Sequence, residues 1–216
     1  MSALARSIVQ ADMPLQPVDS LTGLKALRNR GLEGVIWARS VPETVVEALA
    51  AWPMMNAQAV RICAPVSQIE AASASVLKEW GGLPPDVQAW LAADIAMLAA
   101  SMADLLGVSR LLIRLDPVRD DACRKFHKDA LRARLICTYK GPGTEYGAVQ
   151  NSADQPEEVD SVPTGAPIVL KGKHWGEEPT PFLVHRSPPI EEAGLSRLVF
   201  VVDEAPDDMR EGVIRL

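Results

Sequence analysis

Residues 126–143 read FHKDALRARLICTYKGPG, and this stretch decides the fold class that we predict. Its middle part, residues 132–139, begins with alternating polar and apolar side chains and is followed by the turn-forming sequence Gly-Pro-Gly. Similar short runs, separated by Gly and Pro and without a long helix between them, occupy residues 110–118, 168–170, 182–186 and 198–202. Successive short strands are typical of an antiparallel sandwich or barrel. The C-terminal half therefore predicts a jelly roll.

The N-terminal half has a helical pattern instead. After Pro84-Pro85, apolar residues recur every three or four positions up to Leu105, and Gly107 ends the pattern. Shorter helical segments precede it, together with short strands at residues 34–39 and 59–63. We therefore predict an α+β protein in one continuous domain. In it, a mainly helical part, residues 1–107, packs against a cupin-like double-stranded β-helix that binds metal, residues 108–216.

Composition and charge exclude several classes of protein. With 216 residues, 48% of them hydrophobic, the chain can bury a sizeable core. Its 28 acidic residues outnumber 22 basic ones, so we expect neither nucleic acid nor a membrane surface as a partner. The N-terminus lacks a signal-peptide pattern, because Arg6 and Asp12 interrupt it, and Asp94 and Asp104 interrupt the longest apolar stretch. We expect a cytoplasmic protein that acts on a small molecule or a peptide.

The candidate chemistry lies in an H-x-D step and a distant histidine. If residues 126–129 are extended, alternation places His127 and Asp129 on one face, and His185 lies in the predicted strand 182–186. Two imidazoles and one carboxylate are the set that suits a non-haem Fe(II) centre. Arg197, twelve residues beyond His185, has the chemistry to bind the carboxylate of an organic acid. The alternative is that these are ordinary polar residues at strand ends.

Two more residues are candidate extra ligands. Cys137 alternates with apolar residues, so it is either a buried core thiol or, facing a cavity, a soft ligand that favours zinc. His174 lies beside a turn and is either a loop residue or a fourth ligand. A closed four-coordinate zinc site would suit storage, sensing or delivery, because catalysis needs an open position.

Longer segments of the chain resemble a bacterial family known as a domain of unknown function. The resemblance covers about residues 85–205, shows the pattern FHxD…TYxGPGTE…HRSPP, and rests on the segments FHKDALRARLICTYKGPGTEYG, VLKGKHW, LVHRSPP and RLVFVVDEA. That family is similar to cupins and to 2-oxoglutarate/Fe(II) oxygenases, and its members are often encoded beside GTPases of zinc homeostasis. The resemblance implies that His127, Asp129 and His185 bind the metal, and that Tyr139 and Arg197 bind 2-oxoglutarate.

The activity that the resemblance implies is an Fe(II)/2-oxoglutarate-dependent dioxygenase that hydroxylates an unidentified substrate. The alternative is a non-catalytic zinc-binding protein of metal homeostasis, with a zinc-homeostasis GTPase as partner. Two positions depart from the pattern. The oxygenases usually have Arg-x-Ser where this chain has Arg197-Leu198-Val199, and Tyr146 stands where the family has Trp. Both departures concern the co-substrate more than the metal.

Overall fold

The structure is a computed structural model, and it describes residues 13–121, 123–151, 154–176 and 181–216. Within these residues the strands fall into two sheets. The larger sheet contains β1 (Leu15–Val18), β2 (Gly34–Trp37), β3 (Val60–Pro65), β4 (Arg110–Val118), β5 (Ala133–Lys140), β8 (Pro167–Lys171), β10 (Arg197–Glu204) and β11 (Gly212–Arg215). The smaller sheet contains β6 (Glu145–Val149), β7 (Asp160–Ser161) and β9 (Phe182–Arg186).

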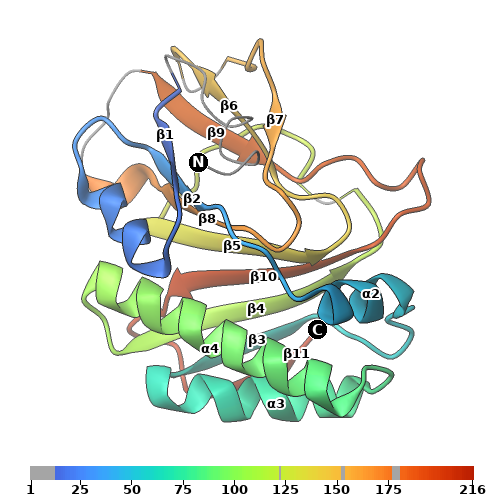
Figure 1. The fold of residues 1–216 in the computed structure, drawn as a ribbon. Helices are drawn as coiled ribbons and strands as arrows, with labels where there is room; N and C mark the ends of the chain where they lie inside the picture. The colour runs from blue at the N-terminus through green and yellow to red at the C-terminus, as the bar shows by residue number, and fades with distance from the viewer. Residues whose placement is uncertain (1–12, 122, 152–153, 177–180) are drawn as a thin grey trace.

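The two sheets and the main helices form three layers, with the large sheet in the middle (Figure 1). Its strand order is β1-β2-β8-β5-β10-β4-β3-β11, and the order of the small sheet is β7-β6-β9. Neighbouring strands run antiparallel except β1 and β2, which are parallel. The fold is therefore a mixed α/β structure around a large antiparallel sheet, as the alternating runs of the C-terminal half predict.

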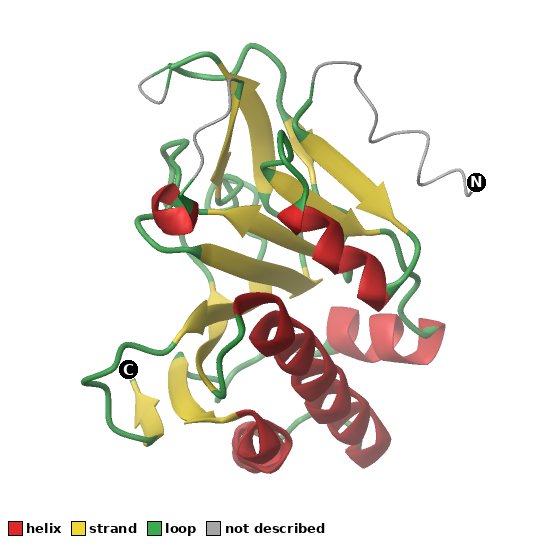
Figure 2. Cartoon of the chain, turned by 90° about the vertical axis from the view of Figure 1, so that its left-hand side faces the viewer, coloured by secondary structure: helices red, strands yellow, loops and turns green. Residues whose placement is uncertain are grey.

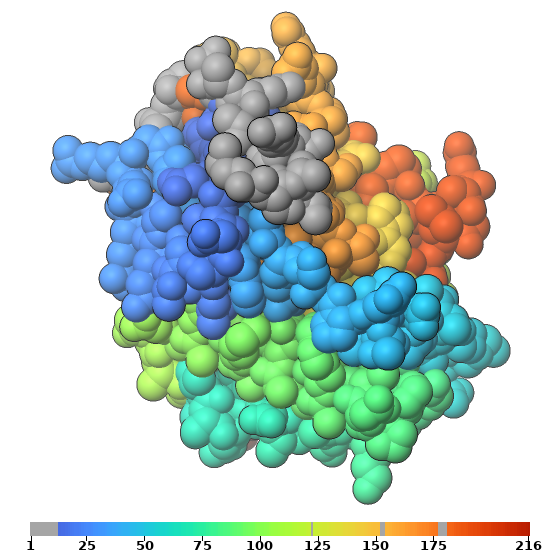
Figure 3. Space-filling view, viewed as in Figure 1, coloured from blue at the N-terminus to red at the C-terminus, as the bar shows by residue number. Residues whose placement is uncertain are grey.

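The helices lie against the face of the large sheet that is turned away from the small sheet (Figure 2). They are η1 (Leu21–Arg28), α2 (Glu43–Ala51), η2 (Val66–Gln68), α3 (Ile69–Trp80) and α4 (Pro85–Leu106), with the short turn η3 (Lys173–Trp175) near β8. The predicted helix after Pro84 is confirmed, and it ends at Gly107, whose φ of 71° suits glycine. On the surface, η1 lies directly beside α4 (Figure 3), where Arg28 donates to the carbonyl oxygen of Leu105.

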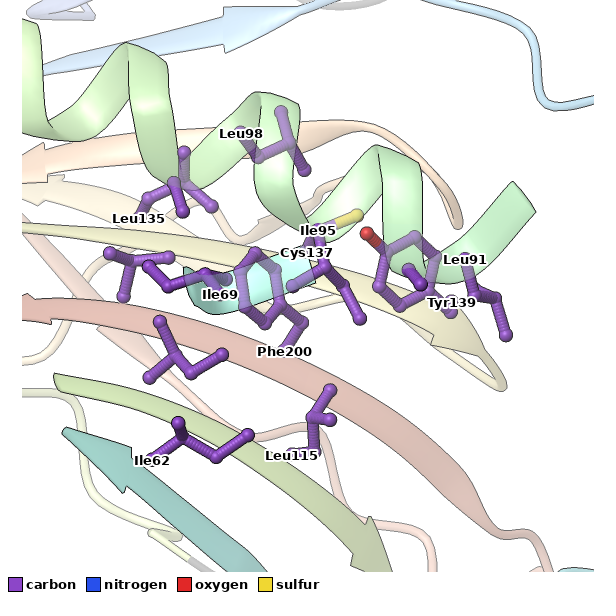
Figure 4. Packing of buried hydrophobic residues seen from close by; sticks show 14 of the residues in the cluster. Ile62, Ile69, Leu91, Ile95, Leu98, Leu115, Leu135, Cys137, Tyr139 and Phe200 are labelled. Atoms are coloured by element: carbon purple, nitrogen blue, oxygen red, sulfur yellow. The ribbon is translucent and has the colours of Figure 1, made fainter. Parts of the chain in front are cut away.

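Helix α4 is long and apolar enough to cross a membrane by length and composition alone. In this fold its apolar side chains have another role, because Leu91, Ile95 and Leu98 are buried in the core. Figure 4 shows them packed against side chains of the large sheet, among them Phe200. Its composition is thus that of a core helix.

Alternation along β5 and β10 separates two hydrophobic layers. Leu135 and Phe200 point toward the helices and belong to the larger core cluster. Ile136 and Val201, each one position further along, belong to a second cluster that includes Tyr146 of the small sheet. The space between the two sheets is therefore lined by the second set of side chains.

The boundary expected between residues 107 and 108 does not divide the large sheet. Strand β2 pairs with β8, and β3 pairs with β4, so the N-terminal part supplies strands at both ends of the sheet. Strand β1 has the sequence LQPV. The sequence pattern did not predict this strand, because four residues are too few to show alternation and one of them is a proline. The short strand β7 lies between β6 and β8 along the chain.

Candidate metal centre

His127 and His185 are brought together by backbone pairing. An isolated antiparallel bridge joins them, with N–O distances of 3.0 Å in both directions. Residues opposite each other in antiparallel strands project to the same side. The two imidazole centroids accordingly lie 4.6 Å apart. On its other side, β9 pairs with β6, which places Tyr146 opposite His185 and fixes this strand within the small sheet.

Asp129 joins the two imidazoles, as the H-x-D spacing predicts. Its Oδ1 lies 3.6 Å from Nε2 of His127, and its Oδ2 lies 3.3 Å from Nε2 of His185. The intervening Lys128 is held elsewhere, since its Nζ donates to buried Glu33 at 2.6 Å. Among the described residues, this trio is the group of potential ligands that lies within 4.8 Å.

The chain around Asp129 is fixed by close packing against Gly172. The backbone N–H of Lys173 donates to the carbonyl oxygen of Asp129 at 2.8 Å, and that of Gly172 donates to Arg132 at 2.8 Å. A Cβ added to Gly172 would lie 2.0 Å from the carbonyl oxygen of Leu131. Glycine is therefore required at this position for residues 129–132 to approach so closely.

Arg134 orients the carboxylate of Asp129. It donates from Nη1 to Oδ1 of Asp129 at 2.6 Å, and from Nε and Nη2 to both oxygens of Asp203 at 2.7 and 2.9 Å. The other oxygen of Asp129, Oδ2, is buried and makes no well-aligned hydrogen bond. A buried carboxylate oxygen without a donor is costly, so Oδ2 is the oxygen available to a cation.

The protonation states of Asp129 and His185 suit a metal. Burial acts to raise the pKa of Asp129, but the two imidazoles and Arg134 outweigh it and hold that pKa well below its usual range. Burial lowers the pKa of His185, whereas the contact with Asp129 raises the pKa of His127. An ionised carboxylate and a neutral imidazole are the forms that bind metal ions.

The distances suit one ion as well. Two ligands at right angles on an ion about 2.1 Å away would lie about 3 Å apart, close to the 3.3 Å between Oδ2 of Asp129 and Nε2 of His185. One ligand atom from each of the three residues lies within 4.8 Å of the others. His127 Nδ1 lies 2.9 Å from the carbonyl oxygen of Lys125, the contact that usually fixes a ligating imidazole. The residues present therefore fit a divalent transition metal.

His127 and His185 line a cavity of about 170 Å³ between the two sheets. The cavity is lined by Arg114, Asp116, Val118, Cys123, His127, Arg134, Ile136, Thr144, His185, Arg186, Ser187, Arg197, Val199 and Val201. Its volume and its partly polar lining allow small organic molecules to enter it.

Arg197 reaches this cavity, and it is 2% exposed. It donates to the carbonyl oxygen of Pro142 at 2.8 Å and to Oγ1 of Thr138 at 3.2 Å, and no carboxylate of the described residues lies within ion-pair distance. Burial lowers the pKa of Arg197 to about 10, so it remains charged at neutral pH. A buried cation with only neutral partners is well placed to bind an anion.

Comparison with known proteins places the chain in a family. The family model described as "Protein of unknown function (DUF1826)" matches residues 18–203. The chain belongs to the DUF1826 family. His127, Asp129, His185 and Arg197 of this DUF1826 protein all lie inside the matched range. A search of curated proteins finds no match.

Solved structures similar to this DUF1826 protein include oxygenases. The rice dioxygenase for auxin oxidation is 14% identical, with a TM-score of 0.49, 93% of this chain and 88% of that chain being covered. The Arabidopsis thaliana dioxygenase for auxin oxidation 1, in a complex with 2-oxoglutarate, is 11% identical (TM-score 0.48; 91% and 94% covered). A Pseudomonas putida prolyl-4-hydroxylase is 16% identical (TM-score 0.45; 87% and 100% covered). Similarities this distant carry no reaction across, so the site is judged by its own residues.

Tyr139, expected at the co-substrate, lies on the opposite face of β5 from the cavity. Its hydroxyl donates to Oδ2 of Asp94 at 2.6 Å, and Arg39 donates to the same oxygen at 2.7 Å. Figure 4 shows the ring of Tyr139 in the hydrophobic layer beneath α4. Tyr139 thus takes part in a buried network beneath α4, and the structure does not bring it to Arg197.

The two candidate extra ligands are also outside the trio. Cys137 points toward the helices, its Sγ lies 3.5 Å from the carbonyl oxygen of Gly165, and burial raises the pKa of its thiol to about 12. His174 is exposed within η3 and does not belong to the ligand group. Neither residue supplies a fourth ligand in this DUF1826 protein. The site residues that the sequence reading missed are Arg114 and Asp203, charged positions in otherwise apolar strands.

Proposed function

We propose that this protein is a mononuclear metal-dependent oxygenase of the Fe(II)/2-oxoglutarate type, built on a double-stranded β-helix, which hydroxylates an unidentified substrate. The observation that carries the proposal is the buried Oδ2 of Asp129, which has no hydrogen-bond partner and lies 3.3 Å from Nε2 of His185, in a group of potential ligands that His127 completes. Two histidines and one carboxylate leave positions open for other molecules, which is the ligand set of non-haem Fe(II) oxygenases.

The residues of the cavity have separate roles in this proposal. When bound, Fe(II) supplies the activation of dioxygen, coupled to the oxidation of 2-oxoglutarate. Arg134 holds Oδ1 of Asp129, so that only Oδ2 faces the ion. Arg197 binds the distal carboxylate of 2-oxoglutarate through its guanidinium group. Val199 and Val201 line the cavity and exclude water from the reacting groups.

Metal analysis of histidine variants tests the proposal. The protein is purified without added metal, loaded with Fe(II) without oxygen, desalted and analysed for metal per chain. We expect about one ion in the unsubstituted protein and its loss in His127→Ala and His185→Ala. His174→Ala is the matched control and should retain the ion, because His174 lies outside the ligand group. Equal metal content in all four proteins would refute the site.

The zinc alternative has less support from the geometry. A closed structural zinc site needs four protein ligands, and the described residues place three together. If the purified protein retains zinc from the cells and does not bind 2-oxoglutarate, a role in metal homeostasis with a GTPase partner would be favoured instead.

A further inference from the structure

Arg114 occupies the cavity floor at a distance from the site of Arg197. On β10, Val201 is opposite both Ile136 of β5 and Arg114 of β4, so these three form one row across the floor. Arg197 is opposite Val118, four residues along β4 from Arg114. At about 3.3 Å per residue, the two positions are about 13 Å apart along the strand. The Arg114 side chain is directed toward Asp203, and that of Arg197 toward Pro142 and Thr138, so the two guanidinium groups occupy separate places.

The pairing of Arg114 within the protein is incomplete. Its Nη2 lies 3.3 Å from Oδ2 of Asp203, whose two oxygens already accept hydrogen bonds from Arg134. The Nε of Arg114 is buried and has no hydrogen-bond partner. Its cross-strand neighbour Arg61 is also a cation, and that residue takes the nearby carboxylate of Asp116. Burial lowers the pKa of Arg114 in spite of Asp203.

The charges in the cavity, counted with the metal ion and 2-oxoglutarate bound, also favour an anion site at Arg114. A divalent ion, Arg114, Arg134 and Arg197 together bring five positive charges, whereas Asp129, Asp203 and the two carboxylates of 2-oxoglutarate bring four negative ones. The other lining cations are paired, as Arg186 is with Glu145. One positive charge remains in a largely enclosed space, where an unpaired charge is costly.

We propose that Arg114 binds an acidic group of the molecule that is hydroxylated, and that this substrate is a small organic acid. The inference rests on the proposed function for the charges of the loaded site and for the word hydroxylated, whereas the anion site itself is built from Arg114. The guanidinium of Arg114 would bind the carboxylate through its terminal N–H groups, because its Nε is buried. Its side chain is 23% exposed, so a ligand can approach it.

Matched acids and amides test this proposal on the full-length protein. The protein is loaded with Mn(II) and saturated with 2-oxoglutarate without oxygen, which fills the Arg197 site. Benzoate, butyrate and phenylacetate are then compared with benzamide, butyramide and phenylacetamide by ligand-observed NMR titration. We expect the acids to bind at least tenfold more tightly than the amides, and Arg114→Gln to remove this preference. Arg114→Lys should keep part of it, because the charge remains and the fork is lost.

Arg110→Gln is the control, because it removes a cation of the same strand that does not line the cavity. It should leave the preference for acids intact. Thermal melting of each variant establishes that it is folded. The proposal is overturned if acids and amides bind equally, if no acid binds, or if folded Arg114→Gln retains the preference. If 2-oxoglutarate does not bind and the acid preference still depends on Arg114, the proposed function fails and the acid site stands.

Discussion

Replacing Arg197 with methionine should separate binding of the co-substrate from stability of the fold. Arg197 is a buried cation whose partners are the neutral oxygens of Pro142 and Thr138. Arg39 has a buried cationic side chain paired with Asp94 of α4, on the helix side of the large sheet. The variants Arg197→Met and Arg39→Met therefore each remove a buried arginine side chain. Arg197 has only neutral hydrogen-bond partners, whereas Arg39 is paired with a carboxylate.

The magnitudes follow from these partners. A hydrogen bond to a charged group contributes about 1.5–3 kcal/mol, which corresponds to a rise of roughly 10- to 150-fold in KM for 2-oxoglutarate in Arg197→Met. Its two lost hydrogen bonds cost about 1 kcal/mol each, and relief of an unpaired buried charge offsets them. In Arg39→Met, Asp94 is left buried without its cation, which costs about 3–5 kcal/mol and lowers Tm by roughly 6–20 °C.

The assay combines thermal melting with consumption of 2-oxoglutarate at varied concentration. Arg197→Met should melt within about 6 °C of the unsubstituted protein, in line with a change below about 2 kcal/mol, and show the raised KM. Arg39→Met should melt much lower and keep an unchanged KM at a temperature where it is folded. An unchanged KM in Arg197→Met would refute the assignment of Arg197, and a large loss of stability there would refute the account of its charge.

Three other substitutions test the positions of single groups. Tyr139→Phe should lower the free energy of unfolding by about 1–3 kcal/mol, through the lost bond to Asp94, and leave KM for 2-oxoglutarate unchanged; a raised KM would contradict the placement of Tyr139 beneath α4. Arg134→Gln should weaken Co(II) binding by about 10- to 100-fold in a titration, as loss of groups that orient ligands does; equal affinity would contradict its role on Asp129. Gly172→Ala should also weaken Co(II) binding, by displacing residues 129–132. An unchanged Co(II) affinity in this variant would show that the close contact between Gly172 and Leu131 is dispensable.

Local patterns in the sequence predicted that His127, Asp129 and His185 would come together, and the structure places their potential ligand atoms within 4.8 Å of one another. The H-x-D step alternates, so two ligands share a face as soon as the chain is extended, and the bridge between His127 and His185 supplies the third. The helix after Pro84 was equally predictable, because its start, its periodicity and its end at Gly107 are all local signals.

The face on which each residue of β5 lies could not be predicted in the same way. This strand is buried on both faces, so apolar residues occur in succession and alternation no longer identifies the cavity side. Cys137 was therefore a candidate site residue, and the family resemblance implied the same for Tyr139, although both point toward the helices. The role of Arg114 depends on its register with Val201 and on the sharing of Asp203, which are long-range contacts that local sequence does not carry.

The central claim is tested most directly by the visible spectrum of the protein in the absence of oxygen. One equivalent of Fe(II) is added per chain, and 2-oxoglutarate is titrated in. The account predicts a weak visible absorption band that saturates at one 2-oxoglutarate per chain and is absent in His127→Ala and His185→Ala. A flat spectrum, with no consumption of 2-oxoglutarate once oxygen is admitted, would contradict it.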